Sequence, residues 1–298
     1  GTIVWLAYYD LVTDGSASEQ YKIFNSELYG GDIEYVSTTS GTAYFEKLAT
    51  MISSDDSPDI VRYEWQSFPT GMSKNMYEPL DGEIDMTSPL WSDMAETAER
   101  FAYKGKHYYY PYRITTNFAL NYHRKSLEEY ALDDPYDLYM NNQWTWDTFK
   151  QLLIDWCSAD DSHIGYAGEG AMSFIATTGT SLVKVQEDGT ARNNLSDINV
   201  SRAMEYCADL YRNGLTYQNE IGDWVSPQLW ADNSDRILFL GMNPEWTYGA
   251  AAGQVQNKPG AADDICNTVS DFAFVPFPRD PQADKYYIAY DTFGYLVA

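Results

Sequence analysis

The chain has 298 residues, of which 44% are hydrophobic, and its 44 acidic and 19 basic residues give a net charge of −25. This length and apolar content are typical of about two domains with cores of their own. The negative charge argues against nucleic-acid binding, because phosphate contacts need clustered lysine and arginine, and it also disfavours binding to an anionic membrane surface.

The N-terminal part of the chain alternates between apolar runs and helical periodicity. Strands are predicted at residues 2–7, 33–37 and 59–63 with helices between them, so we expect a parallel sheet with right-handed crossovers. In such sheets ligands bind beyond the carboxyl ends of the strands. The candidate ligand-binding residues at these ends are Tyr9, Asp10, Ser40, Glu64 and Trp65.

An extended crossover is predicted at residues 110–124. A run of tyrosines favours a strand, and Pro111 then excludes a central ladder position. The alternation at residues 118–122 predicts a second strand. This pattern is typical of a hinge between two α/β lobes, which places a cleft between them. Tyr112 and Arg113 lie beside the hinge and are further candidate ligand-binding residues.

The C-terminal half also mixes helices and strands. Thr145 caps a predicted helix that carries an apolar side through Trp156, and another helix is predicted at 199–212. Residues 133–143 are predicted to form a polar loop. Further strands are predicted at residues 164–166, 182–185, 272–275, 286–289 and 293–297, and residues 236–240 form an apolar run.

Trp224, Trp230 and Trp246 are the remaining candidates, because ligand sites at domain interfaces favour aromatic side chains. Cys157, Cys207 and Cys266 lie far apart without metal-site spacing, so we expect no metal and no other cofactor. Cys157 and Cys207 fall on helical patterns, which predicts buried free thiols.

Short motifs follow one another in a characteristic order. They are Ser57-Pro58-Asp59-Ile60-Val61, Tyr77-Glu78-Pro79-Leu80-Asp81, Tyr110-Pro111-Tyr112, Leu120-Asn121-Tyr122, Thr145-Trp146-Asp147 and Val275-Pro276-Phe277-Pro278. In their order and spacing over residues 1–298, the chain resembles the extracellular solute-binding proteins of ABC transporters, of the family 1 sugar-binding type.

The resemblance implies a two-lobed, periplasmic-binding-protein-like α/β fold of type II with a hinge, with lobe one at residues 1–113 plus 276–298 and lobe two at 114–275. It implies a monomer, with no catalytic residues, that binds a sugar or oligosaccharide in the inter-lobe cleft and delivers it to ABC transporter permease subunits. It also implies an extracellular, membrane-anchored bacterial lipoprotein or a periplasmic protein. Family members continue with helices beyond the strand at Phe293, and we expect those helices to be missing from this sequence.

Two other kinds of function stay open. A glycoside hydrolase needs carboxylates about 5–9 Å apart, which Asp10, Glu64 and Asp291 could supply from strand ends. However, the sequence lacks a Gly-x-Ser-x-Gly elbow, and its three histidines have no partners at triad or metal spacing. A binding protein of the same fold could instead take a polyamine, held by carboxylates and aromatic rings, or a peptide.

Overall fold

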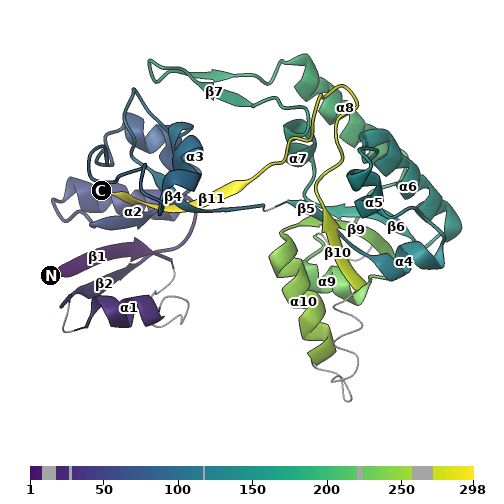
Figure 1. Ribbon diagram of the computed structural model, residues 1–298, viewed down its shortest axis with the longest axis horizontal. Helices are drawn as coiled ribbons and strands as arrows, with labels where there is room; N and C mark the ends of the chain where they lie inside the picture. The colour runs from purple at the N-terminus through teal and green to yellow at the C-terminus, as the bar shows by residue number, and fades with distance from the viewer. Residues whose placement is uncertain (9–17, 27–28, 117, 220–223, 257–270) are drawn as a thin grey trace. The chain divides into compact units, whose positions relative to one another are not determined.

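The computed structural model describes residues 1–8, 18–26, 29–116, 118–219, 224–256 and 271–298. These residues divide into two compact units (Figure 1). Unit 1 comprises Gly1–Ile114, Lys184–Arg192 and Thr292–Ala298, and unit 2 comprises Thr115–Val183 and Asn193–Asp291. Each unit has a sheet of its own flanked by helices, so the expected two-lobed α/β architecture is confirmed.

Unit 1 contains a mixed sheet with the strand order β2-β1-β3-β11-β4. Its elements are β1 (Thr2–Ala7), α1 (Ser18–Phe24), β2 (Asp32–Ser37), α2 (Thr42–Ser53), β3 (Ile60–Arg62), short helical turns at Ser67–Gly71 and Ser92–Met94, α3 (Ala95–Glu99), β4 (Tyr110–Thr115) and β11 (Asp291–Val297). β1 pairs in parallel with β2 and β3, and β11 pairs antiparallel with β3. The predicted parallel arrangement of the N-terminal strands is therefore confirmed.

The core of unit 1 lies between its sheet and α2. Tyr44, Leu48 and Met51 recur at helical spacing on one side of α2 and are buried. They belong to one cluster with Leu6 of β1 and Leu296 of β11. This packing fixes one face of the sheet and thereby the positions at which its strands end.

Unit 2 contains a sheet with the strand order β10-β5-β9-β6. Its elements are β5 (Ala119–His123), α4 (Arg124–Glu129), α5 (Pro135–Met140), α6 (Trp146–Ala159), β6 (Ile164–Gly168), α7 (Ala171–Ala176), α8 (Ile198–Arg212), α9 (Pro227–Asp232), β9 (Ile237–Met242), α10 (Pro244–Gln256) and β10 (Phe272–Val275). A separate hairpin of β7 (Val183–Val185) and β8 (Ala191–Asn193) interrupts unit 2 in the sequence. Most of this hairpin, Lys184–Arg192, belongs to unit 1. β6 is parallel to β9, whereas β5 is antiparallel to both β9 and β10.

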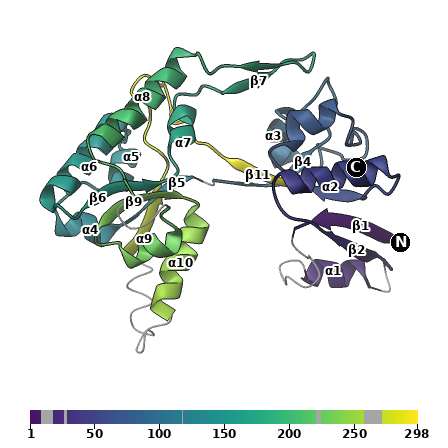
Figure 2. The same ribbon diagram turned by 180° about the vertical axis from the view of Figure 1, so that it is seen from behind.

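Helices cover both faces of the unit 2 sheet (Figures 1 and 2). α6 and α8 bring Phe149 and Leu210 against one face, and α9 brings Trp230 against the other. β9 lies between β5 and β6 and is buried along its whole length. The helix predicted from Thr145 begins as expected, because the Thr145 hydroxyl accepts a hydrogen bond from the Thr148 N–H.

Some short elements differ from the sequence prediction. The predicted loop at residues 133–143 contains α5, because Asp134 accepts the Tyr136 N–H and Pro135 occupies the first helical position. α7 and α9 span six residues each, which is too short to establish a helical period, and both are missing from the prediction. α10 is also missing from it, because its small and mixed residues form no apolar stripe.

The return of the chain to unit 1 also differs from the expected boundary at Pro276. Residues 276–291 belong to unit 2, and the crossing lies between Asp291 and Thr292. The Trp144 indole N–H donates to the Pro276 carbonyl oxygen at 2.8 Å. Buried Asp280 forms an ion pair with Arg202 of α8. These bonds attach the segment to Trp144, just before α6, and to α8, and proline spacing alone could not predict them.

Residues 286–289 form no strand, contrary to the prediction. Tyr286 instead packs its ring edge-on against Tyr139, with 4.9 Å between centroids. The strand predicted beyond it is confirmed as β11.

The cysteines that the structure describes are free. Cys157 and Cys207 are partly buried and form no disulfide, as predicted, whereas Cys266 lies outside the described residues. Burial raises the pKa of Cys207 to about 11, so this thiol stays protonated at neutral pH. None of the described helices is long and apolar enough to cross a membrane.

His107 connects three segments of unit 1. Its ring nitrogens lie 2.8 Å from Asp81 and 2.6 Å from Glu99, and its backbone N–H donates to Asp81 at 2.9 Å. Burial alone would lower the pKa of His107, but the bonds to the two carboxylates outweigh it and raise this pKa. Burial would raise the pKa of Asp81, yet its hydrogen bonds from His107 lower it.

We expect His107→Gln to remove a pH-dependent stabilisation. A histidine whose pKa is higher in the folded than in the unfolded protein stabilises the folded state. This stabilisation is complete below the unfolded-state pKa of about 6.5 and is lost as the pH rises through the folded-state pKa. Because the carboxylates are partly exposed, the effect is on the order of 1 kcal/mol. Urea unfolding near pH 5.5 and near pH 8.5 should show a larger gap between parent and variant at the lower pH. An equal gap at both values would contradict this role.

Candidate functional site

Glu64 marks the carboxyl end of β3 in unit 1 and is held by several neighbours. The Tyr8 hydroxyl donates to Glu64 Oε1 at 3.0 Å, and Arg62 Nε lies 3.4 Å from the same oxygen. The Glu64 N–H donates to Ser67 Oγ at 3.1 Å. Because Tyr8 directly follows β1, these bonds link the ends of two parallel strands at one edge of the sheet.

Two arginines pack on one aromatic ring at this edge. The guanidinium carbons of Arg62 and Arg113 lie 5.4 and 4.3 Å from the centroid of the Phe293 ring. Tyr112 stacks on Tyr295 at 5.5 Å and remains 48% exposed. The predicted crossover residues Tyr112 and Arg113 therefore contact aromatic side chains of β11. Arg113 packs on the same ring, that of Phe293, as Arg62, which lies beside Glu64.

The other candidates of unit 1 have different surroundings. Trp65 is 74% exposed, so it does not pack beneath the loop that follows it. Ser40 is exposed just before α2. Tyr9 and Asp10 lie outside the described residues.

In unit 2, β6 and β9 end side by side because they are parallel. The Glu169 N–H donates to the Gly241 carbonyl oxygen at 2.9 Å, which joins the loop after β6 to β9. Asn121 Nδ2 donates to the carbonyl oxygens of Leu240 and Met242, each at 3.0 Å. These bonds fix the end of β9, from which α10 begins.

Asn243 caps α10 and orients Trp246. Its Oδ1 accepts the backbone N–H groups of Glu245 at 2.9 Å and Trp246 at 3.1 Å. The Trp246 side chain is 64% exposed. A large aromatic ring is thus presented to solvent from a fixed helix start, at the carboxyl end of β9.

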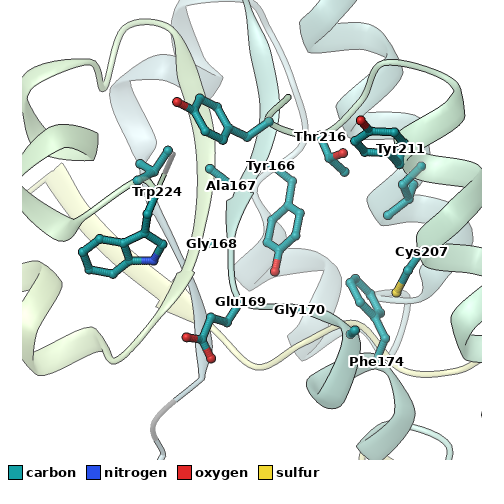
Figure 3. A pocket seen from close by; sticks show the side chains of 14 residues that line it. Tyr166, Ala167, Gly168, Glu169, Gly170, Phe174, Cys207, Tyr211, Thr216 and Trp224 are labelled. Atoms are coloured by element: carbon teal, nitrogen blue, oxygen red, sulfur yellow. The ribbon is translucent and has the colours of Figure 1, made fainter. Parts of the chain in front are cut away.

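A cavity of about 300 Å³ lies beside the carboxyl end of β6 (Figure 3). Trp224 lines it and is 55% exposed, and the exposed Glu169 lies on the turn that follows β6. The other lining residues are Tyr166, Ala167, Gly168, Gly170, Ala171, Phe174, Cys207, Leu210, Tyr211, Thr216, Tyr217 and Val225. The cavity combines aromatic surface with hydrogen-bonding groups and the Glu169 carboxylate, which is a composition found in small-molecule sites.

Trp230 does not belong to this surface, and we correct its expected role. The residue is 0% exposed. Its indole N–H donates to the Ile237 carbonyl oxygen at 3.1 Å, and its ring stacks on His123 at 4.7 Å between centroids. Trp230 was predicted to bind ligand because it lies near two other tryptophans in the sequence. The structure places its side chain against the sheet, on the buried side of α9.

Sequence reasoning missed Tyr166 and the turn Gly168-Glu169-Gly170. A usable signal was present, because this glycine-rich turn directly follows a predicted strand. The rule that places ligand loops at strand ends, applied to Tyr9 and Glu64, holds equally for this position.

In each unit, the strand that follows the connection from the other unit begins at the sheet edge that carries the candidate residues. Ala119, at the start of β5, pairs with Met242 at the end of β9. In unit 1, the Tyr63 N–H donates to the carbonyl oxygen of Gly294, near the start of β11. Both candidate surfaces therefore lie beside the connecting segments of their own unit.

Comparisons with known proteins agree with this architecture. A family model described as bacterial extracellular solute-binding protein matches residues 19–293. No curated protein matches the sequence. The chain is similar in structure to the GacH receptor of Streptomyces glaucescens, solved unliganded and with acarbose, with 17% identity, a TM-score of 0.68, and coverage of 100% of this chain and 71% of that chain.

Two further solved structures are similar. The sugar-binding protein MalE from Xanthomonas citri has 14% identity and a TM-score of 0.72, with coverage of 100% of this chain and 70% of that chain. An ABC transporter solute-binding protein from Thermotoga lettingae, bound with α-D-tagatose, has 17% identity and a TM-score of 0.65, with coverage of 99% and 72%. At these identities the likeness shows the fold.

We expect Asn243→Ala to destabilise unit 2 by about 1 kcal/mol, because two N–H groups at the start of α10 lose their acceptor. Asn243→Ser should recover most of this loss, since serine can also cap a helix. Urea unfolding monitored by tryptophan fluorescence measures both variants. Equal stability of the alanine and serine variants would show that capping is not the role of Asn243.

Proposed function

Because the chain belongs to the bacterial extracellular solute-binding proteins, we propose that it is the substrate-binding component of an ABC importer and that it binds a sugar or oligosaccharide. Trp65 in unit 1 and Trp224 and Trp246 in unit 2 carry the proposal. All three are largely exposed and lie at the ends of their units that carry the candidate surfaces. Exposed indole rings suit the apolar faces of sugar rings, while neighbouring polar groups bond the hydroxyls.

The solved relatives support the sugar class. Their structures hold acarbose, α-D-tagatose, maltose and ribitol, which are neutral or weakly charged polyhydroxylated compounds. On this proposal the exposed tryptophans contact the sugar. The protein acts as a monomer outside the cytoplasm, as a lipoprotein or in the periplasm, and delivers its sugar to the permease subunits.

A polyamine is the less favourable cargo. Glu64 is already bonded by Tyr8 and lies beside Arg62, so it does not offer a free carboxylate to a cation. Arg113 adds a second guanidinium group at the same edge. Two positive charges there would repel a polyamine but can donate to sugar hydroxyls.

The hydrolase alternative depends on Glu64, which neighbouring side chains already hold. It would use Glu64 with Asp10 or Asp291, and Asp10 lies outside the described residues. Glu64 already accepts a hydrogen bond from the Tyr8 hydroxyl and lies beside Arg62, which suits structural support better than proton donation to a substrate. We therefore propose binding without catalysis.

Calorimetric titration of the purified protein tests the proposed function. The panel includes monosaccharides and oligosaccharides, among them acarbose, D-tagatose, maltose and ribitol, with spermidine and a short peptide as competing classes. Saturable binding of a sugar, recovered unchanged afterwards, is the expected result. Binding of spermidine or peptide alone would overturn the sugar assignment, and hydrolysis of an oligosaccharide would overturn the assignment as a binding protein.

We expect Trp65→Ala and Trp246→Ala each to lower sugar affinity by about 2 kcal/mol, roughly thirty-fold, because a stacking ring is lost. Their melting temperatures should change little, since both rings are mostly exposed. Trp230→Ala is the matched control and should cost about 3–5 kcal/mol of unfolding free energy, as a buried tryptophan does. A large drop in melting temperature for Trp65→Ala with intact affinity would assign that ring to packing.

A further inference from the structure

Tyr166 on β6 carries a buried hydroxyl beside the cavity. The residue is 6% exposed, and its oxygen has no hydrogen-bond partner among the residues that the structure describes. A buried hydroxyl without a partner has given up its hydration without compensation, and such groups are rare in native proteins. Figure 3 shows this oxygen directed towards the turn with Glu169 and Gly170, with Trp224 on one side and Cys207 on the other.

Core packing explains the ring of Tyr166 but not its oxygen. The ring centroids of Phe149, Phe174 and Phe277 lie 5.9, 6.3 and 6.4 Å from that of Tyr166. A phenylalanine at this position would make the same ring contacts. Burial raises the pKa of Tyr166 well above its ordinary value. The hydroxyl therefore stays protonated and can both donate and accept a hydrogen bond.

Glycines surround this hydroxyl and keep side chains away from it. A Cβ atom at Gly170 would lie 2.3 Å from the oxygen, and one at Gly241 would lie 2.5 Å from it. Gly168 has φ +94°, which disfavours other residues, and a Cβ there would lie 2.5 Å from the Gly241 carbonyl oxygen. The hydroxyl thus lies against the backbone of Gly170 and Gly241, at the turn that borders the cavity.

We infer that Tyr166 is a specificity-determining residue whose hydroxyl hydrogen-bonds a hydroxyl group of the bound sugar. The inference rests on the proposed function. The oxygen is shielded from solvent in this structure, so the turn at residues 168–170 shifts when a sugar ring enters the cavity. The cavity of about 300 Å³ is at the small end for ligand pockets, which suits one ring of a larger sugar.

Tyr166→Phe separates this role from a structural one. The probe is the compound of the calorimetric panel that binds the parent protein most tightly. Because one neutral hydrogen bond is lost, affinity should fall about fivefold to tenfold. The melting temperature without sugar should stay the same or rise, because the variant removes a buried hydroxyl without a protein partner.

Tyr122→Phe is the matched control. Its hydroxyl donates to Asp134 at 2.5 Å in the same unit, and its side chain is fully buried. This variant should show the opposite pattern, with a lower melting temperature and unchanged affinity.

Deoxy derivatives of the same sugar identify the hydroxyl that is contacted. The parent should bind one derivative more weakly than the intact sugar, whereas Tyr166→Phe should bind both equally. A lower melting temperature of Tyr166→Phe with unchanged affinity would assign the hydroxyl to a buried water and overturn the inference. Equal affinity of parent and Tyr166→Phe would overturn the inference and leave the proposed function intact. Failure of every sugar to bind the parent would overturn the proposed function, and the inference with it.

Discussion

Parallel strand pairing is the constraint on which both candidate surfaces depend. β1 pairs in parallel with β2 and β3 in unit 1, and β6 with β9 in unit 2. Parallel strands need long connections that return to the start of the sheet, so the loops that leave their carboxyl ends gather at one edge. Helices fill the faces of the sheets, and the edge is left for recognition.

The residues at these edges are held by bonds that leave aromatic faces exposed. Backbone and amide bonds to Gly241 and Met242 fix the end of β9, and Asn243 orients the first turn of α10. In unit 1, Glu64 and Arg62 bond one another and Tyr8, while Trp65 next to them remains open. Hydrogen bonds that hold the backbone beside an exposed ring lower the conformational entropy lost on binding, because fewer protein groups have to be ordered when a ligand binds.

Most of the fold could be predicted from the sequence. Apolar runs and helical periodicity located β1, β2, β3, α2, α6 and α8, because each buries apolar side chains. Residues 236–240 were recognised only as an apolar run, and they belong to β9 apart from Arg236. The short helices α7 and α9 could not be found this way. The boundary at Asp291 depends on bonds such as that from Trp144 to Pro276, which join residues far apart in the sequence.

The position of a candidate residue could be predicted where a strand end was visible, but not where only residue type was used. Glu64 and Trp65 were located by the end of β3. Trp230 was proposed because it is a tryptophan near two others, but α9 turns it into the core. The hydroxyl of Tyr166 could not be anticipated, since an unpartnered polar atom is a property of three-dimensional packing.

The position of β11 has a consequence for the order in which the protein folds. This strand, Asp291–Val297, lies inside the unit 1 sheet between β3 and β4, although it follows the strands of the unit 2 sheet in the sequence. During synthesis, the strands of unit 2 at residues 119–275 are all available before β11 has been made. Unit 2 can therefore complete its sheet first, whereas the unit 1 sheet stays incomplete until β11 has been synthesised.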